Sequence, residues 1–187
     1  MKTVLCIVVV LVLVSSTSLA VLPPYGYMGL YIDEHETYCT SGEGFYPVEM
    51  WIWCLPSERG MICAEFMIVY PANIIQSTVT VNPEVSVTLG TLDTGMSVCF
   101  VDCQWDWQWP FHQALWVTDP TQTEIEIEKH PDPMIECVQF ANCETGYPTE
   151  CCVVHTRLCI NYPECPPWPC IGTEEASWGA IKSIIEK

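Results

Sequence analysis

Positively charged residues are scarce in this 187-residue chain, which has six Lys and Arg against 23 Asp and Glu and a formal net charge of −17. Removal of an N-terminal signal that contains Lys2 leaves 23 acidic against five basic residues, a net charge of −18. Such a surface repels nucleic-acid phosphates and anionic lipids. We therefore expect no nucleic-acid partner, and we interpret the charge mainly as a source of solubility outside the cell.

Long apolar runs are absent after the N-terminus. One run follows Lys2, spans about ten residues and precedes Ser18-Leu19-Ala20, a small-x-small pattern typical of a signal-peptidase site. It is too short to cross a bilayer comfortably. Cys6 lies inside the run and not at the cleavage point, so a lipid anchor is not expected. The sequence predicts a signal peptide over 1–20 and a secreted or extracytoplasmic mature protein, in the periplasm or at the cell surface, without membrane insertion.

Recognisable catalytic motifs are also absent. The chain has no G-x-S-x-G elbow, no H-E-x-x-H motif, no phosphate-binding glycine loop and no EF-hand. The four histidines are dispersed, and we interpret the run Asp33-Glu34-His35-Glu36 as a solvated loop and not as a cation site. We therefore predict no catalytic residue, no metal ligand and no cofactor. An enzyme acting on glycans remains the alternative.

Cysteine is abundant, but its spacing is not that of a metal site. No C-x-x-C pair occurs, although Cys151, Cys152, His155 and Cys159 are close enough in sequence for zinc to compete. An even number of cysteines in an exported chain indicates a disulfide framework. We expect six bridges and no free thiol. The twelve mature cysteines are Cys39, Cys54, Cys63, Cys99, Cys103, Cys137, Cys143, Cys151, Cys152, Cys159, Cys165 and Cys170.

Strand-like segments rich in Val, Ile, Thr and aromatics alternate with turn residues, and no helical period occurs before residue 173. In TEIEIEK, residues 123–129, Glu and Ile alternate as in a strand with one solvated face. The pattern predicts an all-β protein, an antiparallel β-sandwich stapled by disulfides. The expected strands are Met28–Asp33, Pro47–Leu55, Ile62–Tyr70, Gln76–Val81, Val85–Leu89, Met96–Asp102, Ala114–Thr118, Glu124–Lys129, Glu136–Ala141 and Val153–Ile160.

The turn residues 56–60 join two of these strands into a hairpin, with Cys54 and Cys63 close to the turn. Facing residues of paired strands lie about 4.5 to 5.5 Å apart between Cα atoms, which suits a disulfide. We therefore expect Cys54 to bond to Cys63.

The middle of the chain resembles a known family of sandwiches. It reads AEFMIVYP, a Pro-Ala-Asn turn, a Thr/Val strand and then GTLDTGMSVCF, with Tyr70-Pro71, Gly90 and Gly95 at the turns. This order is similar to that of cohesin-like and related immunoglobulin-like β-sandwiches of secreted bacterial proteins. The resemblance implies an immunoglobulin-like sandwich and does not identify a partner.

The C-terminal part has another character. Residues 163–170, PECPPWPC, cannot continue a sheet because proline lacks a backbone donor. Thr173 is placed to cap a short helix in which Trp178, Ile181 and Ile185 form an apolar stripe. The predicted division is a sandwich domain over 21–162 and a Pro/Cys-rich arm with a short C-terminal helix over 163–187. The helix either docks on the domain or acts as a sorting signal.

Residues 103–116, CQWDWQWPFHQALW, are the densest aromatic stretch. In an extended strand Trp105, Trp107 and Trp109 would share one face, with Asp106 and Gln108 between them as hydrogen-bonding groups. These five residues are the candidate ligand-binding site, a platform on which sugar rings stack. The alternative is that the indoles pack against the sheet, and we favour it because Pro110 would end the extended run.

Together these patterns favour a secreted, non-catalytic binding or structural module of the cell envelope or extracellular space, with a polysaccharide or an envelope protein as partner. Carbohydrate binding through the Trp stretch is its sharper form. A glycan-active enzyme and a Cys-rich inhibitor or effector are the alternatives.

Overall fold

The computed structural model describes residues 24–33, 37–42 and 44–165. All the regular structure in these residues is β-strand, which confirms the predicted class. They include no helix long and apolar enough to cross a membrane. The predicted signal peptide and C-terminal helix lie outside the described residues, and the domain division at residue 163 stays a prediction.

Each of the ten predicted strands is found, with the last one split into β12 and β13, and β2 and β11 are additional short strands. The strands are β1 (Tyr27–Tyr31), β2 (Cys39–Thr40), β3 (Tyr46–Leu55), β4 (Met61–Val69), β5 (Ile74–Val81), β6 (Val85–Thr91), β7 (Gly95–Gln104), β8 (Gln108–Val117), β9 (Thr123–Glu128), β10 (Gln139–Ala141), β11 (Thr149–Cys151), β12 (Val153–Thr156) and β13 (Leu158–Ile160).

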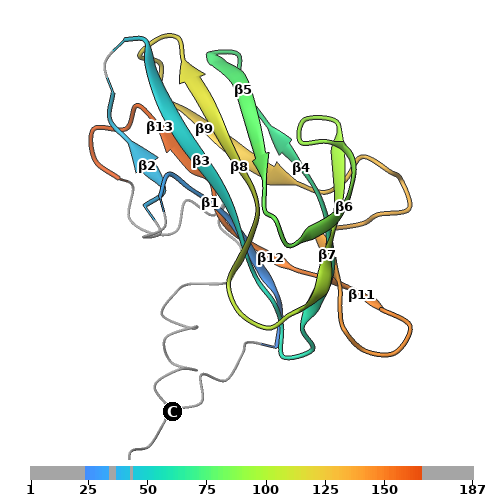
Figure 1. Ribbon diagram of the computed structural model, residues 1–187. Coiled ribbons are helices and arrows are strands. Elements are labelled where there is room, and N and C mark those ends of the chain that lie inside the picture. Colours follow the sequence, from blue (N-terminus) through green and yellow to red (C-terminus); the bar gives the residue numbers. More distant parts are fainter. Residues whose placement is uncertain (1–23, 34–36, 43, 166–187) are drawn as a thin grey trace, which may run out of the picture.

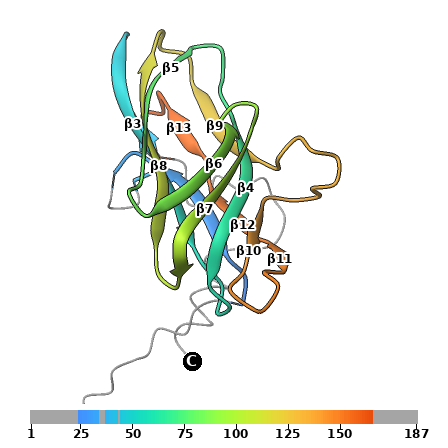
Figure 2. The ribbon, with the colours of Figure 1, turned by 45° about the vertical axis from the view of Figure 1, so that its right-hand side comes forward.

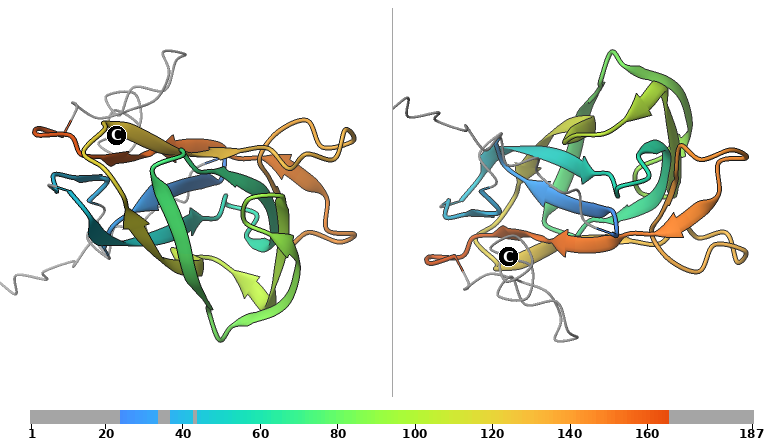
Figure 3. Two further views of the ribbon diagram at one scale, coloured as in Figure 1. Left: turned by 90° about the horizontal axis from the view of Figure 1, so that it is seen from above. Right: turned by 90° about the horizontal axis from the view of Figure 1, so that it is seen from below.

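The strands form a two-layer sandwich (Figure 1). The first sheet has the order β12-β1-β3-β8-β5. The second has the order β11-β10-β4-β9-β13-β2, with β7 paired to β4 and β6 paired to β7. Views along the strands separate the layers, with β1 and β3 (blue to cyan) in one and β9 and β13 (gold to red) in the other (Figure 3).

Two strand pairs are parallel, so the sheets are mixed and not purely antiparallel as expected. They are β1 with β12 and β2 with β13. In both pairs a strand from the C-terminal third of the described chain returns beside an N-terminal strand. Alternation along single strands cannot reveal such a long-range pairing.

Alternating side chains build the core between the sheets. Along β3, Met50 and Ile52 are fully buried, while Trp51 between them points outward. Phe66 of β4 meets Phe111 of β8 across the sandwich in an edge-to-face contact, with ring centroids 6.4 Å apart. The core is therefore built from one face of each of these strands.

Four disulfides join the described residues: Cys39–Cys165, Cys63–Cys99, Cys103–Cys143 and Cys137–Cys151. They confirm a disulfide framework. Adjacent Cys151 and Cys152 do not share a bridge, because Cys151 bonds to Cys137 and the Cys152 side chain is buried in the core. Cys170 lies outside the described residues.

The expected Cys54–Cys63 bridge is wrong. Cys63 bonds to Cys99, its partner in the β4–β7 ladder, with Cα atoms 4.0 Å apart. The Cys54 side chain of β3 points into the core. Cys63 of β4 precedes inward-facing Ala64 and therefore lies on the outer face of its sheet. Cys54 and Cys152 are buried thiols here, which departs from the expectation of complete pairing. Burial raises the pKa of both thiols.

Candidate ligand-binding surface

The outer face of the first sheet carries a cluster of large aromatic rings. Strand β3 points Trp51 and Trp53 away from the core, because they alternate with buried Met50, Ile52 and Cys54. Both indoles remain half-buried at the surface. A strand with one face in the core would normally place polar residues on the other, so this face is unusual.

Strand β8 completes the cluster through an irregular pairing with β3. Ile52 pairs with Phe111 and Cys54 pairs with Gln108, so β8 has one residue more than β3 in this interval. The extra residue indicates a β-bulge, where a proline is tolerated in a strand. Pro110 therefore lies within β8, and the expectation that it would end the extended run is wrong.

Asn82, between β5 and β6, holds the bulge in place. Its side-chain amide donates to the carbonyl of Trp109 over 2.9 Å, and its backbone N–H donates to the carbonyl of Pro110 over 3.0 Å. Asn82 is itself 6% exposed. The side-chain amide and the backbone N–H of this one residue thus satisfy two carbonyls of the bulged segment.

The rings contact one another closely. Trp51 and His112 stack with centroids 4.2 Å apart and planes at 17°. Trp51 also lies 6.2 Å from Trp53, nearly parallel to it, and meets Trp109 edge-on at 5.1 Å. Trp53 meets Trp107 edge-on at 6.5 Å. We call Trp51, Trp53, Trp107, Trp109 and His112 the aromatic cluster.

The structure does not place the three predicted tryptophans in one row. Trp107 and Trp109 join the aromatic cluster, whereas Trp105 is 53% exposed on the connection between β7 and β8. A Cβ on Gly60 would lie 3.1 Å from the Trp105 indole and 2.9 Å from Sγ of Cys143, so Trp105 packs beside the Cys103–Cys143 bridge.

Trp105 lies apart from Trp107 and Trp109 because residues 105–107 form the connection between β7 and β8 and not an extended strand. Asp106, one of the proposed hydrogen-bonding residues, accepts a hydrogen bond over 2.7 Å from the backbone N–H of Trp107, which fixes this connection. Gln108 begins β8 opposite Cys54 and is half-buried. The period-2 argument therefore fails at the turn, although two of the three indoles do share a surface.

Sequence reasoning missed the polar edge and the far end of this surface. Nε2 of His112 lies 2.5 Å from Oε2 of Glu49, a half-exposed carboxylate on β3. Farther along, Phe45 stacks on Trp116 with centroids 5.0 Å apart, and exposed Ile75 of β5 pairs with Trp116. The outward alternation of Glu49, Trp51 and Trp53 was a signal available in the sequence.

On the β1 side the same sheet face is closed. The Tyr31 side chain is 1% exposed, and its hydroxyl contacts Nδ1 of His155 at 3.2 Å. Tyr27 meets the same imidazole edge-on at 5.7 Å. Burial lowers the pKa of His155 to about 4, so this imidazole is neutral at physiological pH. This end therefore stabilises the sheet, and the accessible rings lie over β3 and β8.

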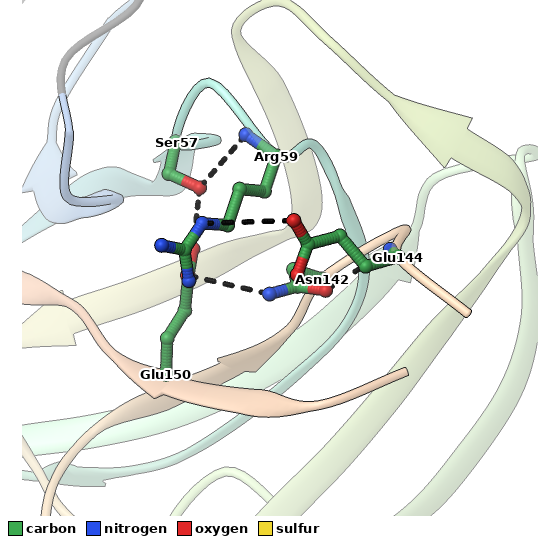
Figure 4. A network of polar contacts seen from close by, with 5 residues as sticks. All are labelled: Ser57, Arg59, Asn142, Glu144 and Glu150. Atoms are coloured by element: carbon green, nitrogen blue, oxygen red, sulfur yellow. Dashed lines mark hydrogen bonds and ion pairs between the residues drawn. The ribbon is translucent and has the colours of Figure 1, made fainter. Parts of the chain in front are cut away.

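A second polar cluster joins the β3–β4 turn to the β10–β11 loop (Figure 4). The Ser57 hydroxyl donates to the Glu150 carboxylate, and Nδ2 of Asn142 donates to the same carboxylate over 3.4 Å. Arg59 lies 3.6 Å from Glu150 and 3.9 Å from Glu144. A serine beside a carboxylate invites comparison with a nucleophile, but Ser57 is 0% exposed and cannot reach a substrate. The network is structural.

Among the described residues no group of three or more His, Cys, Asp and Glu side chains is arranged to hold a metal ion. Two of the glutamates of β9 form ion pairs with an arginine side chain. Nη1 of Arg157 lies 2.9 Å from both Glu124 and Glu126. The aromatic cluster is therefore the candidate site.

No protein-family model and no curated protein sequence matches this chain. Similar solved structures are cohesins. The cohesin module of a family 33 glycoside hydrolase from Clostridium perfringens has a TM-score of 0.50 at 11% identity, covering 74% of this chain and 98% of that one. The seventh ScaB type I cohesin from Pseudobacteroides cellulosolvens has a TM-score of 0.49 at 13% identity, covering 80% and 99%. A type I cohesin–dockerin complex from Clostridium thermocellum, Coh-OlpC-Doc435, has a TM-score of 0.49 at 9% identity, covering 74% and 94%. The fold of this chain is a cohesin-like β-sandwich, as the resemblance in its middle segment predicted.

Proposed function

We propose that this protein is an extracellular, non-catalytic module that binds a protein partner through the aromatic cluster. The main support for this proposal is the position of the aromatic cluster. Its four indoles and one imidazole come from β3, β8 and the β7–β8 connection and lie outside the core, on the outer face of the first sheet. The core does not need them, since the inner face of the same strands fills it. Tryptophan is enriched among residues that dominate binding energy at protein interfaces.

The ring geometry favours a protein over a sugar. Stacking of a pyranose needs a free, flat ring face, but His112 covers one face of Trp51 at 4.2 Å. Trp109 meets Trp51 edge-on and Trp107 meets Trp53 edge-on, both at interplanar angles of 80°. Such a ridged surface accommodates apolar and cationic side chains between its rings.

The electrostatics indicate what such a partner offers. The chain is acidic, and Glu49 is half-exposed beside His112 at the border of the aromatic cluster. A partner segment with Arg or Lys flanking apolar side chains would match both the charge and the rings. The predicted signal peptide and the four disulfides support a site of action outside the cytosol.

Carbohydrate binding is the second candidate. The exposed Trp105, together with Trp107, Trp109, Asp106 and Gln108, is the set proposed from the sequence, and the 53% exposure of Trp105 supports it. In this case the β7–β8 connection, and not the paired rings over β3, would hold the ligand.

The experiment compares three variants of the mature, oxidised protein. Binding to the exported proteins of the source organism and to insoluble cellulose and chitin is measured for wild type, Trp53→Ala, Trp107→Ala and Trp105→Ala, each checked for folding by near-UV circular dichroism. We expect Trp53→Ala and Trp107→Ala to weaken binding to a protein at least tenfold and Trp105→Ala to leave it unchanged. Retention on a polysaccharide that Trp105→Ala abolishes would establish the second candidate instead. Binding that survives both Trp53→Ala and Trp107→Ala would overturn the proposed surface.

A further inference from the structure

The second sheet ends in an uncharged strand whose outer edge has no partner among the described residues. Strand β6 (Figure 2) pairs with β7 alone. Its residues after half-buried Val85 are all exposed. Natural proteins usually protect such an edge with charged residues, proline or an irregularity. The sequence VSVTLGT of β6 contains neither charge nor proline.

The irregularities of β6 lie towards its two ends, where the register shifts after Val85 and Gly90 has a positive φ of 87°. Its register with β7 shifts only between Val85 and Val87, and residues 87–91 then pair in sequence with β7. Strand β5, an uncharged edge strand of the first sheet, shifts in its middle, between Gln76 and Val79. A regular edge is a template for another strand, whereas a mid-strand bulge bends the edge away from one. Of the two strands, β6 is the better template.

Apolar side chains accompany this edge. Val87 is 46% exposed, Leu89 is 65% exposed, and Val101 of the neighbouring strand β7 is 63% exposed. Val87 and Leu89 pair with Cys99 and Ser97 of β7, so they share the outer face of the second sheet. A strand added at this edge would place its own side chains beside both of them.

We propose that β6 pairs with β6 of a second copy of this chain, antiparallel and about a two-fold axis at Thr88, which continues the second sheet across two molecules. This axis sets Thr88 opposite Thr88 of the second copy and Val87 opposite Leu89 of the second copy. Cross-strand pairs of β-branched and apolar residues stabilise an antiparallel ladder, and paired threonines form hydrogen bonds. The edge is thus self-complementary, as a two-fold interface requires.

The distribution of charge indicates where two copies can meet. Acidic surfaces of two copies repel each other, since each chain has a net charge of −17. Residues 66–92 include one charged residue, Glu84. The region around β6 is therefore where two copies approach with least repulsion.

The same pairing predicts how salt acts on the dimer. Glu84 precedes β6 and Asp93 follows it. In the antiparallel arrangement Glu84 of one copy comes next to Asp93 of the other at both ends of the ladder. Both carboxylates carry a negative charge and repel each other, and dissolved salt screens repulsion between exposed charges. Added salt should therefore strengthen the association.

The test is sedimentation equilibrium of the mature, oxidised protein over a range of concentrations and of NaCl. We expect a monomer–dimer equilibrium that tightens as salt increases. Thr88→Lys should raise the dissociation constant at least tenfold, because it places two like charges opposite each other. The matched control is Thr78→Lys on exposed β5, which adds the same charge to the other edge and should leave the equilibrium within twofold of wild type.

A third variant, Glu84→Gln, should strengthen the dimer severalfold and reduce its dependence on salt. Wild type that stays monomeric at every concentration and salt level would overturn the proposal. So would a dimer that Thr78→Lys disrupts and Thr88→Lys does not.

Discussion

Trp51 and His112 face each other across the β3–β8 ladder, and their rings stack 4.2 Å apart between centroids. The pair lies outside the core, on the face opposite Met50 and Ile52. Because Trp51 also contacts Trp53 and Trp109, it is the centre of the aromatic cluster. The surface is therefore organised by strand pairing and not by a single stretch of sequence.

A double-mutant cycle should measure this stack. We expect Trp51→Ala and His112→Ala to be coupled by about 0.5–1.5 kcal/mol in the free energy of unfolding, the range for aromatic pairs beyond their buried area. Urea denaturation of the wild type, both single variants and the double variant gives the value.

The control cycle combines His112→Ala with Trp105→Ala, because Trp105 lies on the β7–β8 connection, beside Gly60 and away from the stack. These two changes should add within about 0.5 kcal/mol. Equal coupling in both cycles would mean that the stack contributes nothing specific.

Acidification should destabilise the protein through His155. Burial lowers the pKa of its imidazole to about 4 in the folded state, against 6.5 for an ordinary histidine. The unfolded chain therefore binds a proton more readily, and the free energy of unfolding falls as pH decreases from 6.5 to about 4. The expected loss from this group is about 3 kcal/mol, at about 1.4 kcal/mol per pKa unit.

Because many carboxyl groups titrate near the same pH, the measurement is a difference between two proteins. The unfolding free energy of wild type and of His155→Gln is followed from pH 7 to pH 4. The wild-type curve should fall more steeply, since only wild type takes up this proton on unfolding. Parallel curves would show that His155 is not held neutral by the fold.

Much of the fold could be predicted from local pattern. The alternation in TEIEIEK marked β9, and the face that carries Ile125 and Ile127 does lie in the core. These predictions succeed because period-2 patterning depends on each strand alone. The parallel pairings of β12 and β13 could not be found this way, since they join segments far apart in sequence.

The candidate site was predictable only in part, because it depends on pairing between strands as well as on the pattern within each strand. Trp107 and Trp109 were candidate ligand-binding residues in the sequence, but their contacts with Trp53 and Trp51 depend on how β8 pairs with β3. The disulfides depend on pairing too. Cys63 lies nine residues from Cys54 in sequence, yet the β4–β7 ladder brings it to Cys99.

Cys54 and Cys152 should be unreactive thiols in the folded protein. Both are buried, and burial raises their pKa values, so the nucleophilic thiolate is rare and shielded. With a maleimide under native conditions neither residue should be labelled, whereas both should be labelled in guanidinium without reductant. Peptide mapping assigns the sites. A disulfide-linked peptide containing Cys54 and Cys152 would contradict this prediction.

Reduction of the disulfides should unfold the domain. The bridges close loops of 14 to 126 residues, and in the chain-entropy model each contributes about 3–5 kcal/mol. A domain of this size is typically stable by only about 5–15 kcal/mol. Near-UV circular dichroism should therefore be lost on reduction. A fully reduced protein that keeps its near-UV spectrum would refute the argument. As a control, the double substitution Cys137→Ser and Cys151→Ser opens only the shortest loop and should leave a folded protein with a lower free energy of unfolding.

Asn82→Ala should disturb the aromatic cluster from a position outside it. The substitution removes the donor that satisfies the carbonyl of Trp109 and the acceptor for the backbone N–H of Glu84. Loss of a buried partner costs about 1–3 kcal/mol.

Asn82→Asp separates the two bonds, because it retains the acceptor but lacks the donor to Trp109. If that donor positions the bulge, both variants should shift the tryptophan fluorescence and weaken ligand binding, while Gln76→Ala on exposed β5 changes neither. Wild-type fluorescence in Asn82→Asp would show that the bulge holds Trp109 without this bond.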